Sequence, residues 1–314
     1  MSQVHVVFGS GPLGRAVMQA LVAHGHSVRM VSRSGAMAET PAGVEVIAGD
    51  LYDPTFVRRV TQGASAAYQC AQPHYHEWPL KFPPLQDAIL EGLAGTATRL
   101  VLAENLYAYG RQNGVPLRED FPFAAHTRKG KVRAALTQTA LGAHQDGRVQ
   151  VAIGRGSDFF GPWVTDSSHG ERVFTPALAG KAATFAGNLD VPHTATYIGD
   201  FGRALVTLGE RDEALGQAWH VPNDRPTITQ REFAAMIFEQ LGTEPRVSSV
   251  SKGMMRMAGL FIPGARETVE MMYEFERPFV VDSSRFEATF GERATPLPQA
   301  IQATLDWYRN HPPK

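Results

Sequence analysis

The chain has almost none of the features that mark extracellular proteins or metal-binding proteins. It has 314 residues and only one cysteine, Cys70, so no disulfide can form within it. Cys70 ends the apolar run "ASAAYQC", which predicts a buried, unreactive thiol. Its histidines and its cysteine do not show the spacing of a metal site, and no metal is expected.

The chain also lacks a charge excess and a long apolar run. Its 30 basic and 31 acidic residues give a net charge of −1, so neither nucleic acid nor a membrane is an expected partner. No apolar run approaches the roughly 18–20 residues that span a bilayer. The start, "MSQVHVVFGSG", does not resemble a signal peptide. We therefore expect a cytoplasmic protein.

Short apolar runs alternate with helical patterns in the first half of the chain. The expected strands are 4–9, 27–33, 44–50, 65–71, 98–105 and 148–155, and the expected helices are 13–25, 54–63, 83–95 and about 128–145. Continuous apolar strands that alternate with helices predict a parallel sheet covered on both faces. The expected fold class is α/β, a Rossmann-type doubly wound parallel sheet with a smaller C-terminal substrate-binding cap.

The regular alternation stops near residue 155. We expect a dinucleotide-binding core over 1–155, to which 197–222 returns, and a cap built from 156–196 and 223–314. The cap segments are rich in proline, glycine and aromatic residues, with helices expected near 229–241 and 253–275.

A glycine-rich turn lies directly between the first strand and the first helix. "GSGPLG" fits the G-x-G-x-x-G pattern of dinucleotide sites. Gly9 permits the tight turn, Gly11 lets the backbone approach a pyrophosphate, and Gly14 lets helix and strand pack closely. The expected cofactor contacts in this turn are Gly9, Ser10, Gly11, Pro12, Leu13 and Gly14.

The end of the second strand indicates which dinucleotide binds. NAD sites usually place a carboxylate there, but this chain has "VSRSG", with Ser32, Arg33 and Ser34. A guanidinium suits a 2′-phosphate, so NADP(H) is the expected cofactor and NAD the weaker alternative. Loop residues after the next two strands complete the expected set: Asp50, Leu51 and Ala71.

Several stretches together resemble the extended short-chain dehydrogenase/reductase family, the epimerase/dehydratase type. They are "GSGPLG", "GDL", "ENLYAYG", "RGSDFFGP" and "TYIGDFGRAL", and they span at least residues 4–221. The resemblance implies an NAD(P)-dependent oxidoreductase or epimerase/dehydratase-like enzyme. It also admits a homodimer, because many members dimerise through helices of the main domain.

The chain departs from this family at its catalytic residues. A Tyr-x-x-x-Lys pair follows the fifth strand in the family, and its only counterpart here is Thr127 with Lys131, in "HTRKGKVRAAL". An aliphatic hydroxyl is a far weaker acid than a phenol, so Thr127 can donate a hydrogen bond but transfers a proton poorly. Lys131 is expected to face the cofactor, and Arg128, Lys129 and Arg133 to face water. The family's Ser/Thr position falls on Asn105, which can polarise a carbonyl.

Three residues can replace the missing acid. Tyr107 follows Asn105 by two positions, where family dehydratases place a substrate-facing Glu. It is expected to be either the proton donor or a residue that packs or contacts substrate. Tyr75 lies after the fourth strand, in a loop expected to line the substrate crevice. His126 precedes the helix.

The substrate is less well defined than the cofactor. In nucleotide-sugar enzymes of the family, an Asn contacts the substrate diphosphate, but the matching residue here is Asp158, whose carboxylate would repel it. Five methionines in "KGMMRMAGLFIPG" and "VEMMYEF" predict either core packing or an adaptable wall around an apolar substrate.

Three functions remain open at this point. The first is NADPH-dependent reduction of a small, fairly apolar carbonyl or enone with a non-standard proton donor. The second is a non-catalytic NADPH-binding sensor or interaction protein. The third, a nucleotide-sugar epimerase or dehydratase, is disfavoured by Asp158 and Thr127.

Overall fold

The computed structural model describes residues 2–112, 114–261 and 263–312, and it divides into two compact units. Unit 1 comprises 1–108, 129–156 and 201–221. Unit 2 comprises 109–128, 157–200 and 222–314. The segment 109–128 thus belongs to unit 2, although we expected it in the dinucleotide-binding core.

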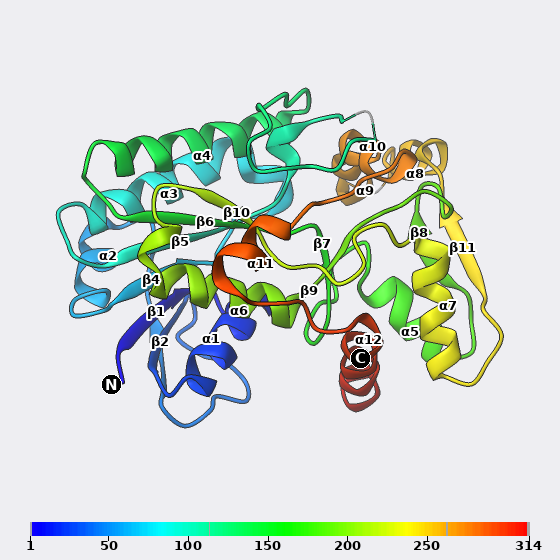
Figure 1. The fold of residues 1–314 in the computed structure, drawn as a ribbon, viewed down its shortest axis with the longest axis horizontal. Helices are drawn as coiled ribbons and strands as arrows, with labels where there is room; N and C mark the ends of the chain where they lie inside the picture. The colour runs from blue at the N-terminus through cyan, green and yellow to red at the C-terminus, as the bar shows by residue number, and fades with distance from the viewer. Residues whose placement is uncertain (1, 113, 262, 313–314) are drawn as a thin grey trace. The chain divides into compact units, whose positions relative to one another are not determined.

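Unit 1 is built on one seven-stranded sheet (Figure 1), in the order β10-β6-β5-β4-β1-β2-β3. Every neighbouring pair is parallel. The strands are β1 Val4–Phe8, β2 Ser27–Ser32, β3 Val44–Ala48, β4 Ala66–Gln69, β5 Arg99–Glu104, β6 Val151–Arg155 and β10 Ala218–His220. The expected Rossmann-type sheet is confirmed. Its order reverses beside β1, which is where such sheets bind dinucleotides.

Helices cover both faces of this sheet. They are α1 Pro12–Ala23, α2 Pro54–Val60, α3 Trp78–Leu93, α4 Arg128–Gln145 and α6 Ile198–Glu210, with the short 3₁₀ segments η1 Tyr75–Glu77, η2 Tyr107–Tyr109 and η3 Asp212–Ala214. Residues of α2, α3 and α4 share a hydrophobic core with the strands on one face. Helices α1 and α6 approach closely enough that a Cβ on Gly202 would meet the backbone of Ala16 at 2.6 Å.

Local sequence signals set several helix boundaries. The Asp53 side chain caps α2 by accepting the amide N–H of Thr55 at 2.9 Å. Helix α3 begins at Trp78, five residues before its expected start, and contains Pro83 and Pro84. The buried Trp78, Phe82 and Leu85 anchor it on the sheet, so packing outweighs the backbone hydrogen bonds that the prolines cannot donate.

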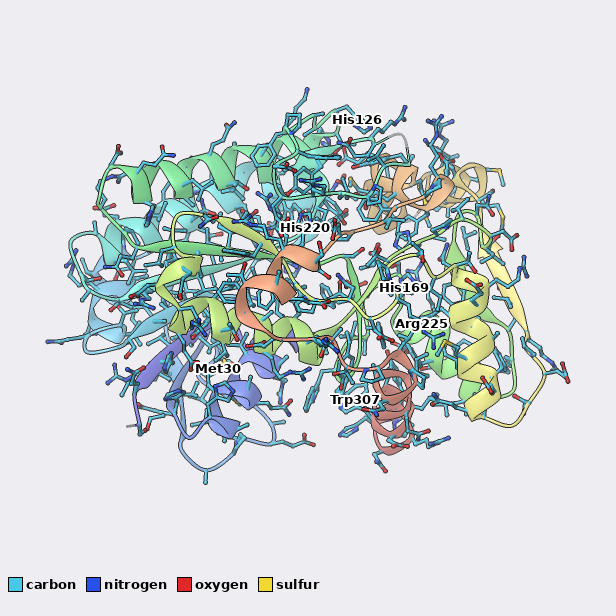
Figure 2. The ribbon with its side chains drawn as sticks, in the orientation of Figure 1. Met30, His126, His169, His220, Arg225 and Trp307 are labelled. Atoms are coloured by element: carbon cyan, nitrogen blue, oxygen red, sulfur yellow. The ribbon has the colours of Figure 1, made fainter. Side chains whose placement is uncertain are left out.

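Side chains of the sheet are buried as far as its edge strand β10. Met30 of β2 and His220 of β10, both labelled in Figure 2, have no exposed surface. Cys70 follows β4, and burial raises the pKa of its thiol to about 12. The side chain is only half-buried, so the predicted full burial is wrong, but the raised pKa agrees with the unreactive thiol that the sequence predicts.

Unit 2 consists of small sheets and short helices around a separate core. The strand pairs are β7 Asp158–Phe160 with β9 Ala195–Tyr197, and β8 Ala183–Ala186 with β11 Val247–Val250. The helices are α5 Glu171–Leu178, α7 Gln230–Gln240, α8 Lys252–Ala258, α9 Pro263–Thr268, α10 Tyr273–Glu276, α11 Ser284–Phe290 and α12 Leu297–Asn310, with the 3₁₀ segment η4 Val269–Met271. Their core includes Phe160, Phe174 and Phe233.

The single helix expected over 253–275 is wrong. Helix α8 ends at Ala258 with Gly259 as its C-cap, and α9 starts at Pro263, so a glycine and a proline divide the segment. Met255, Met271 and Met272 are buried, while Met254 and Met257 are exposed. Three of the five methionines therefore belong to the core, which agrees with the first of the two interpretations, core packing. No helix in the described residues is long and apolar enough to cross a membrane.

Candidate functional site

The glycine turn has the geometry of a dinucleotide cradle. Gly9 has a φ of +105°, and a Cβ there would meet Ala71 N at 2.8 Å. A Cβ on Gly14 would lie 1.9 Å from the carbonyl oxygen of Gly9, so only glycine allows this packing of α1 on β1. Gly11 is the N-cap of α1 and has open space beside its Cα. The backbone N–H groups at the start of α1 therefore face room for a pyrophosphate.

The loop after β2 is polar and exposed, as a site for an adenosine ribose requires. Arg33 and Ser34 are exposed, and Ser32 Oγ accepts the amide N–H of Gly35 at 3.1 Å. Arg15 of α1 reaches the same loop by donating to the Ala38 carbonyl at 3.0 Å. The loop thus carries Arg33, which the sequence indicated, and is also contacted by Arg15, which it did not.

The other predicted cofactor residues lie at the same edge of the sheet. Ala71 follows β4 and touches the Gly9 turn. Asp50 follows β3, where its carboxylate accepts the amide N–H of Tyr52 at 3.0 Å. Leu51 is half-buried and packs against the core of unit 1. Asp50 therefore stabilises its own turn.

The expected orientation of the start of α4 is wrong. Lys131, expected to face inward, is exposed, whereas Lys129 and Arg133 are only 1% and 5% exposed. Residues four apart share a helix face, so Lys129 and Arg133 turn inward together. Lys131 lies two positions from each, about 200° around the helix, and projects from the other side.

Lys129 lies against a pair of tyrosines. Its Nζ atom is 4.3 Å from the centre of the Tyr75 ring, a cation–π geometry. The Tyr75 hydroxyl donates a hydrogen bond to the Tyr107 hydroxyl at 3.3 Å. Tyr75 comes from η1 after β4 and Tyr107 from η2 after β5. The structure thus brings together two phenols that sequence reasoning treated separately, and adds a buried ammonium beside them.

Asn105 begins the turn that carries Tyr107. Its Oδ1 accepts the backbone N–H of Tyr107 at 3.3 Å. This bond uses the amide oxygen, so the NH₂ group is the part of Asn105 that can donate to a substrate oxygen. Asn105 thereby orients Tyr107, and its predicted role in polarising a carbonyl stays a prediction.

Arg133 packs against two aromatic side chains close to these tyrosines. Its guanidinium lies 4.3 Å from the Trp78 ring centre and 4.5 Å from that of Phe82, and it donates to Gln72 Oε1 at 3.1 Å. Burial lowers the pKa of Arg133 to about 10, although the Glu104 carboxylate acts in the opposite direction. The group remains charged at neutral pH and adds positive potential beside Tyr75 and Tyr107.

A buried ion pair ties α4 to the sheet. Glu104 ends β5, Arg155 ends β6, and the two are register partners. Their side chains are 3% and 1% exposed, with Arg155 Nε 3.1 Å from Glu104 Oε2. The Thr137 hydroxyl of α4 lies 2.9 and 2.8 Å from the two carboxylate oxygens of Glu104. This network holds α4 on the sheet and so positions Lys129 and Arg133.

Two predicted residues, His126 and Thr127, lie in unit 2. The Thr127 hydroxyl is 7% exposed and donates to the Met271 sulfur at 3.6 Å. The His126 ring packs edge-on against Tyr273, with ring centres 4.7 Å apart. Burial, then the charge of Arg111, lowers the pKa of His126. The Glu270 carboxylate acts on the His126 pKa in the opposite direction, but burial outweighs it.

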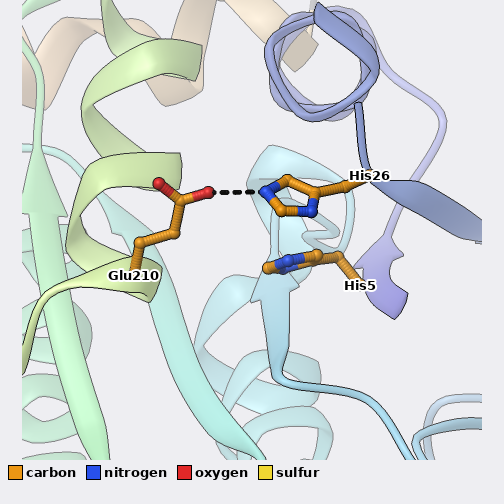
Figure 3. A group of neighbouring side chains, drawn as sticks. All are labelled: His5, His26 and Glu210. Atoms are coloured by element: carbon orange, nitrogen blue, oxygen red, sulfur yellow. Dashed lines mark hydrogen bonds and ion pairs between the residues drawn. The ribbon is translucent and has the colours of Figure 1, made fainter. Parts of the chain in front are cut away.

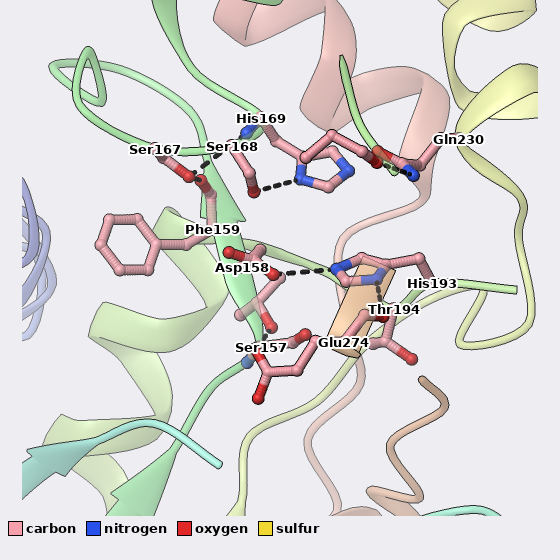
Figure 4. Close-up of polar contacts among 12 residues, drawn as sticks. Ser157, Asp158, Phe159, Ser167, Ser168, His169, His193, Thr194, Gln230 and Glu274 are labelled. Carbon is pink, nitrogen blue, oxygen red and sulfur yellow. Dashed lines mark hydrogen bonds and ion pairs between the residues drawn. The ribbon is translucent and has the colours of Figure 1, made fainter. Parts of the chain in front are cut away.

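Asp158 belongs to a buried polar cluster of unit 2 (Figure 4). Its Oδ2 lies 2.8 Å from His193 Nε2, and His193 Nδ1 lies 3.2 Å from the Glu274 carbonyl oxygen. Burial alone would raise the pKa of Asp158, but its hydrogen bond with His193 lowers it below the ordinary value. The Asp158 carboxylate is thus stabilised in its charged form by an internal partner.

Sequence reasoning missed Lys129, Arg133, Arg15 and the Glu104–Arg155 pair. Arg155 begins the "RGSDFFGP" stretch, and Lys129 and Arg133 lie within the quoted basic segment. A helical wheel of α4 would have shown that Lys129 and Arg133 share a face with Leu136, Thr137 and Ala140, all buried. That signal was present, but it competes with the usual assumption that charged side chains face water.

The parallel sheet, the glycine cradle and the polar edge define a dinucleotide-binding enzyme of the Rossmann type. Residues 5–221 match the NAD dependent epimerase/dehydratase family, about the span that the sequence motifs cover. The chain belongs to this family, and the expected family membership is confirmed. Its class is therefore that of NAD(P)-dependent oxidoreductases and epimerase/dehydratase-like enzymes. No curated protein matches the chain.

Solved structures agree with this fold. A nucleoside-diphosphate-sugar epimerase from Pseudomonas aeruginosa is similar, with a TM-score of 0.77, 18% identity and 99% coverage of both chains. A UDP-N-acetylglucosamine 4-epimerase from Methanobrevibacter ruminantium has a TM-score of 0.78, 14% identity and coverage of 98% and 99%. A UDP-glucuronic acid 4-epimerase from Bacillus cereus, solved with UDP-glucuronic acid and NAD, has a TM-score of 0.76, 15% identity and the same coverage. At these identities the likeness establishes the fold.

Proposed function

We propose that this protein is an NADP(H)-dependent reductase of a small, fairly apolar carbonyl or enone. The observation that carries the proposal is the buried Lys129 ammonium over the ring of Tyr75, whose hydroxyl donates a hydrogen bond to that of Tyr107. A phenol beside a cation is the chemistry that the family uses for proton transfer, here built from other positions. The two tyrosines replace the acid that is missing at Thr127.

The residues of unit 1 fit the cofactor. Gly9, Gly11 and Gly14 form a cradle that side chains would fill, and Arg15 and Arg33 flank the loop that would hold a 2′-phosphate. Bound NADPH would supply the hydride. Lys129, rather than Lys131, is the lysine we assign to the cofactor ribose, because its side chain turns inward from the first turn of α4.

The chain's own groups would then act on the substrate oxygen. The Asn105 amide donates a hydrogen bond that polarises the carbonyl. Tyr107 supplies the proton and is replenished by Tyr75, which already donates to it. The Lys129 charge favours the phenolate that forms.

Arg33 tests the choice of cofactor. We expect wild-type protein to bind NADPH more tightly than NADH, and Arg33→Ala to weaken NADPH binding about tenfold while leaving NADH binding unchanged. The expected loss is one charge-assisted hydrogen bond to phosphate, about 1.5–3 kcal/mol, reduced by the exposure of the loop. Fluorescence titration of both dinucleotides measures this. Equal affinities in the wild type would refute the NADP(H) preference.

Tyr107 tests the proton donor. A stopped-flow panel of carbonyls and enones, followed by NADPH absorbance, should identify at least one substrate. On that substrate we expect Tyr107→Phe to lower kcat about 10²-fold, the low end for a positioned acid, because the Tyr75 hydroxyl remains nearby. Phe121→Tyr, a substitution in unit 2, serves as a control for a change of one hydroxyl. Unchanged turnover in Tyr107→Phe would reject the assignment.

A non-catalytic NADPH-binding sensor is the second candidate. The family's tyrosine, four positions before its lysine, is missing for either lysine of this chain. Thr127 stands four positions before Lys131, and Ala125 stands four positions before Lys129. Tight NADPH binding without oxidation by any member of the panel would favour the sensor.

The nucleotide-sugar reaction of the similar structures is less favoured. Asp158 is held as a carboxylate by His193, so it would repel a diphosphate at the position where the family places an amide.

A further inference from the structure

Three side chains from separate elements of unit 1 meet near the amino end of β1 (Figure 3). His5 lies on β1, His26 directly precedes β2, and Glu210 ends α6. One ligand-type atom from each lies within 4.8 Å of the others. His26 Nε2 is 3.0 Å from Glu210 Oε1, and the His5 and His26 ring centres are 4.6 Å apart.

His5 is the residue that points to a ligand. Its side chain has no exposed surface, and its Nε2 atom has no hydrogen-bond partner in the described structure. Its other nitrogen, Nδ1, lies 3.2 Å from the Tyr68 hydroxyl. When Nδ1 carries the proton and donates it to Tyr68, Nε2 presents a lone pair. Metal-binding histidines typically hold their second nitrogen in this way.

The charge state of the group also suits a cation. Glu210 supplies a negative charge, and its side chain is 28% exposed, which leaves a path from solvent. A fourth donor is close, because His24 Nδ1 lies 3.5 Å from the same Glu210 oxygen.

We propose that His5, His26 and Glu210 bind a divalent transition-metal ion of the Zn²⁺ type. Two imidazoles and one carboxylate are a ligand set that Zn²⁺ accepts, with the remaining position taken by water or His24. The spacing of histidines along the chain does not reveal this group, because its members come from three elements distant in sequence. No metal was expected from the sequence, so the proposal departs from that expectation.

Binding requires one rearrangement. The backbone N–H of Gln3 donates to His26 Nδ1 at 3.3 Å, so the His26 proton lies on Nε2 and points at Glu210. When the ion takes Nε2, that proton moves to Nδ1 and the ring stays neutral. The Gln3 amide then loses its acceptor, but it lies at an exposed position and can bond to water.

The ion would act as a structural clamp. Its ligands join β1, the connection from α1 to β2, and the end of α6. His5 is four residues before Gly9, about 13 Å along an extended strand, so the ion would not take part in cofactor chemistry. Metal binding should therefore stabilise unit 1 without changing NADPH affinity.

Titration of full-length, EDTA-treated protein tests the proposal. Calorimetry with Zn²⁺, and absorption spectra with Co²⁺ as a probe of ligand geometry, should show one ion per chain and a raised melting temperature. We expect His26→Ala and Glu210→Gln to weaken binding at least about tenfold, the least that disturbing a metal's ligands usually does. Glu210→Gln removes the charge but keeps the side-chain volume. A loss of Zn²⁺ binding in this variant therefore does not result from misfolding.

The matched control is the exposed pair His74 and His76, whose rings stack 6.1 Å apart in the same unit. Replacing both by alanine should leave Zn²⁺ affinity unchanged. The proposal fails if wild-type protein does not bind Zn²⁺ or Co²⁺, if His26→Ala and Glu210→Gln bind as tightly as wild type, or if the His74/His76 variant loses the binding.

Discussion

Lys129→Met is expected to lower kcat/KM for NADPH-dependent reduction about 10³-fold, the upper end of what removing one preorganised electrostatic contact costs. The substitution keeps an unbranched side chain in the 1%-exposed position but removes the ammonium beside Tyr75. Both the proposed cofactor contact and the charge that favours a phenolate would be lost. Steady-state kinetics measures the effect, and fluorescence titration with NADPH separates binding from chemistry.

Lys131→Met is the matched control, on the same helix turn and with the same change of side chain. Because Lys131 is exposed, we expect kinetics and NADPH affinity within about twofold of wild type, as for most surface substitutions. If Lys131→Met lowers activity or NADPH affinity and Lys129→Met does not, Lys131 is the lysine that contacts the cofactor, as the sequence predicted. If no substrate is found, the NADPH titration alone still distinguishes the two lysines.

Glu104→Gln is expected to have the largest effect on stability. It leaves the Arg155 guanidinium, 1% exposed, without its carboxylate, and removing one partner of a buried ion pair typically costs about 3–5 kcal/mol. The Thr137 hydroxyl in the middle of α4 also loses a charged acceptor, so the attachment of α4 to the sheet should weaken. Urea unfolding followed by tryptophan fluorescence and circular dichroism measures the change.

Arg118→Gln provides the comparison. It breaks the Arg118–Asp120 pair, whose side chains are 59% and 67% exposed, and exposed pairs contribute little to stability. We expect its unfolding midpoint to match wild type. If Glu104→Gln unfolds at the same urea concentration as Arg118→Gln, the buried pair is not what holds α4 on the sheet.

The sheet of unit 1 was predictable because its signals are local and repeated. Apolar runs such as "VHVVFG" followed by glycine and an amphipathic helix specify a buried parallel strand and its crossover without long-range information. Boundaries failed where packing outweighs local preference. Helix α3 passes through Pro83 and Pro84, and the expected helix over 253–275 breaks around Gly259 and Pro263.

The candidate site was predictable where backbone geometry decides it, and only partly where side chains decide it. Gly9 and Gly14 follow from the steric limits of a turn, which a motif records. Lys129 does not follow from a motif, because its role depends on Tyr75, 54 positions away in sequence and adjacent only in the fold. The Tyr75–Tyr107 pair likewise joins loops after two different strands.

Cys70 has a practical consequence for measuring motion in solution. Cys70 is half-buried, and the raised pKa of its thiol leaves little thiolate to react with maleimide reagents at neutral pH. A cysteine introduced at an exposed position of each unit, such as Lys131 and Met257, would therefore take up a donor and an acceptor dye with little background labelling. The native chain is thus a ready background for single-molecule energy transfer between the two units.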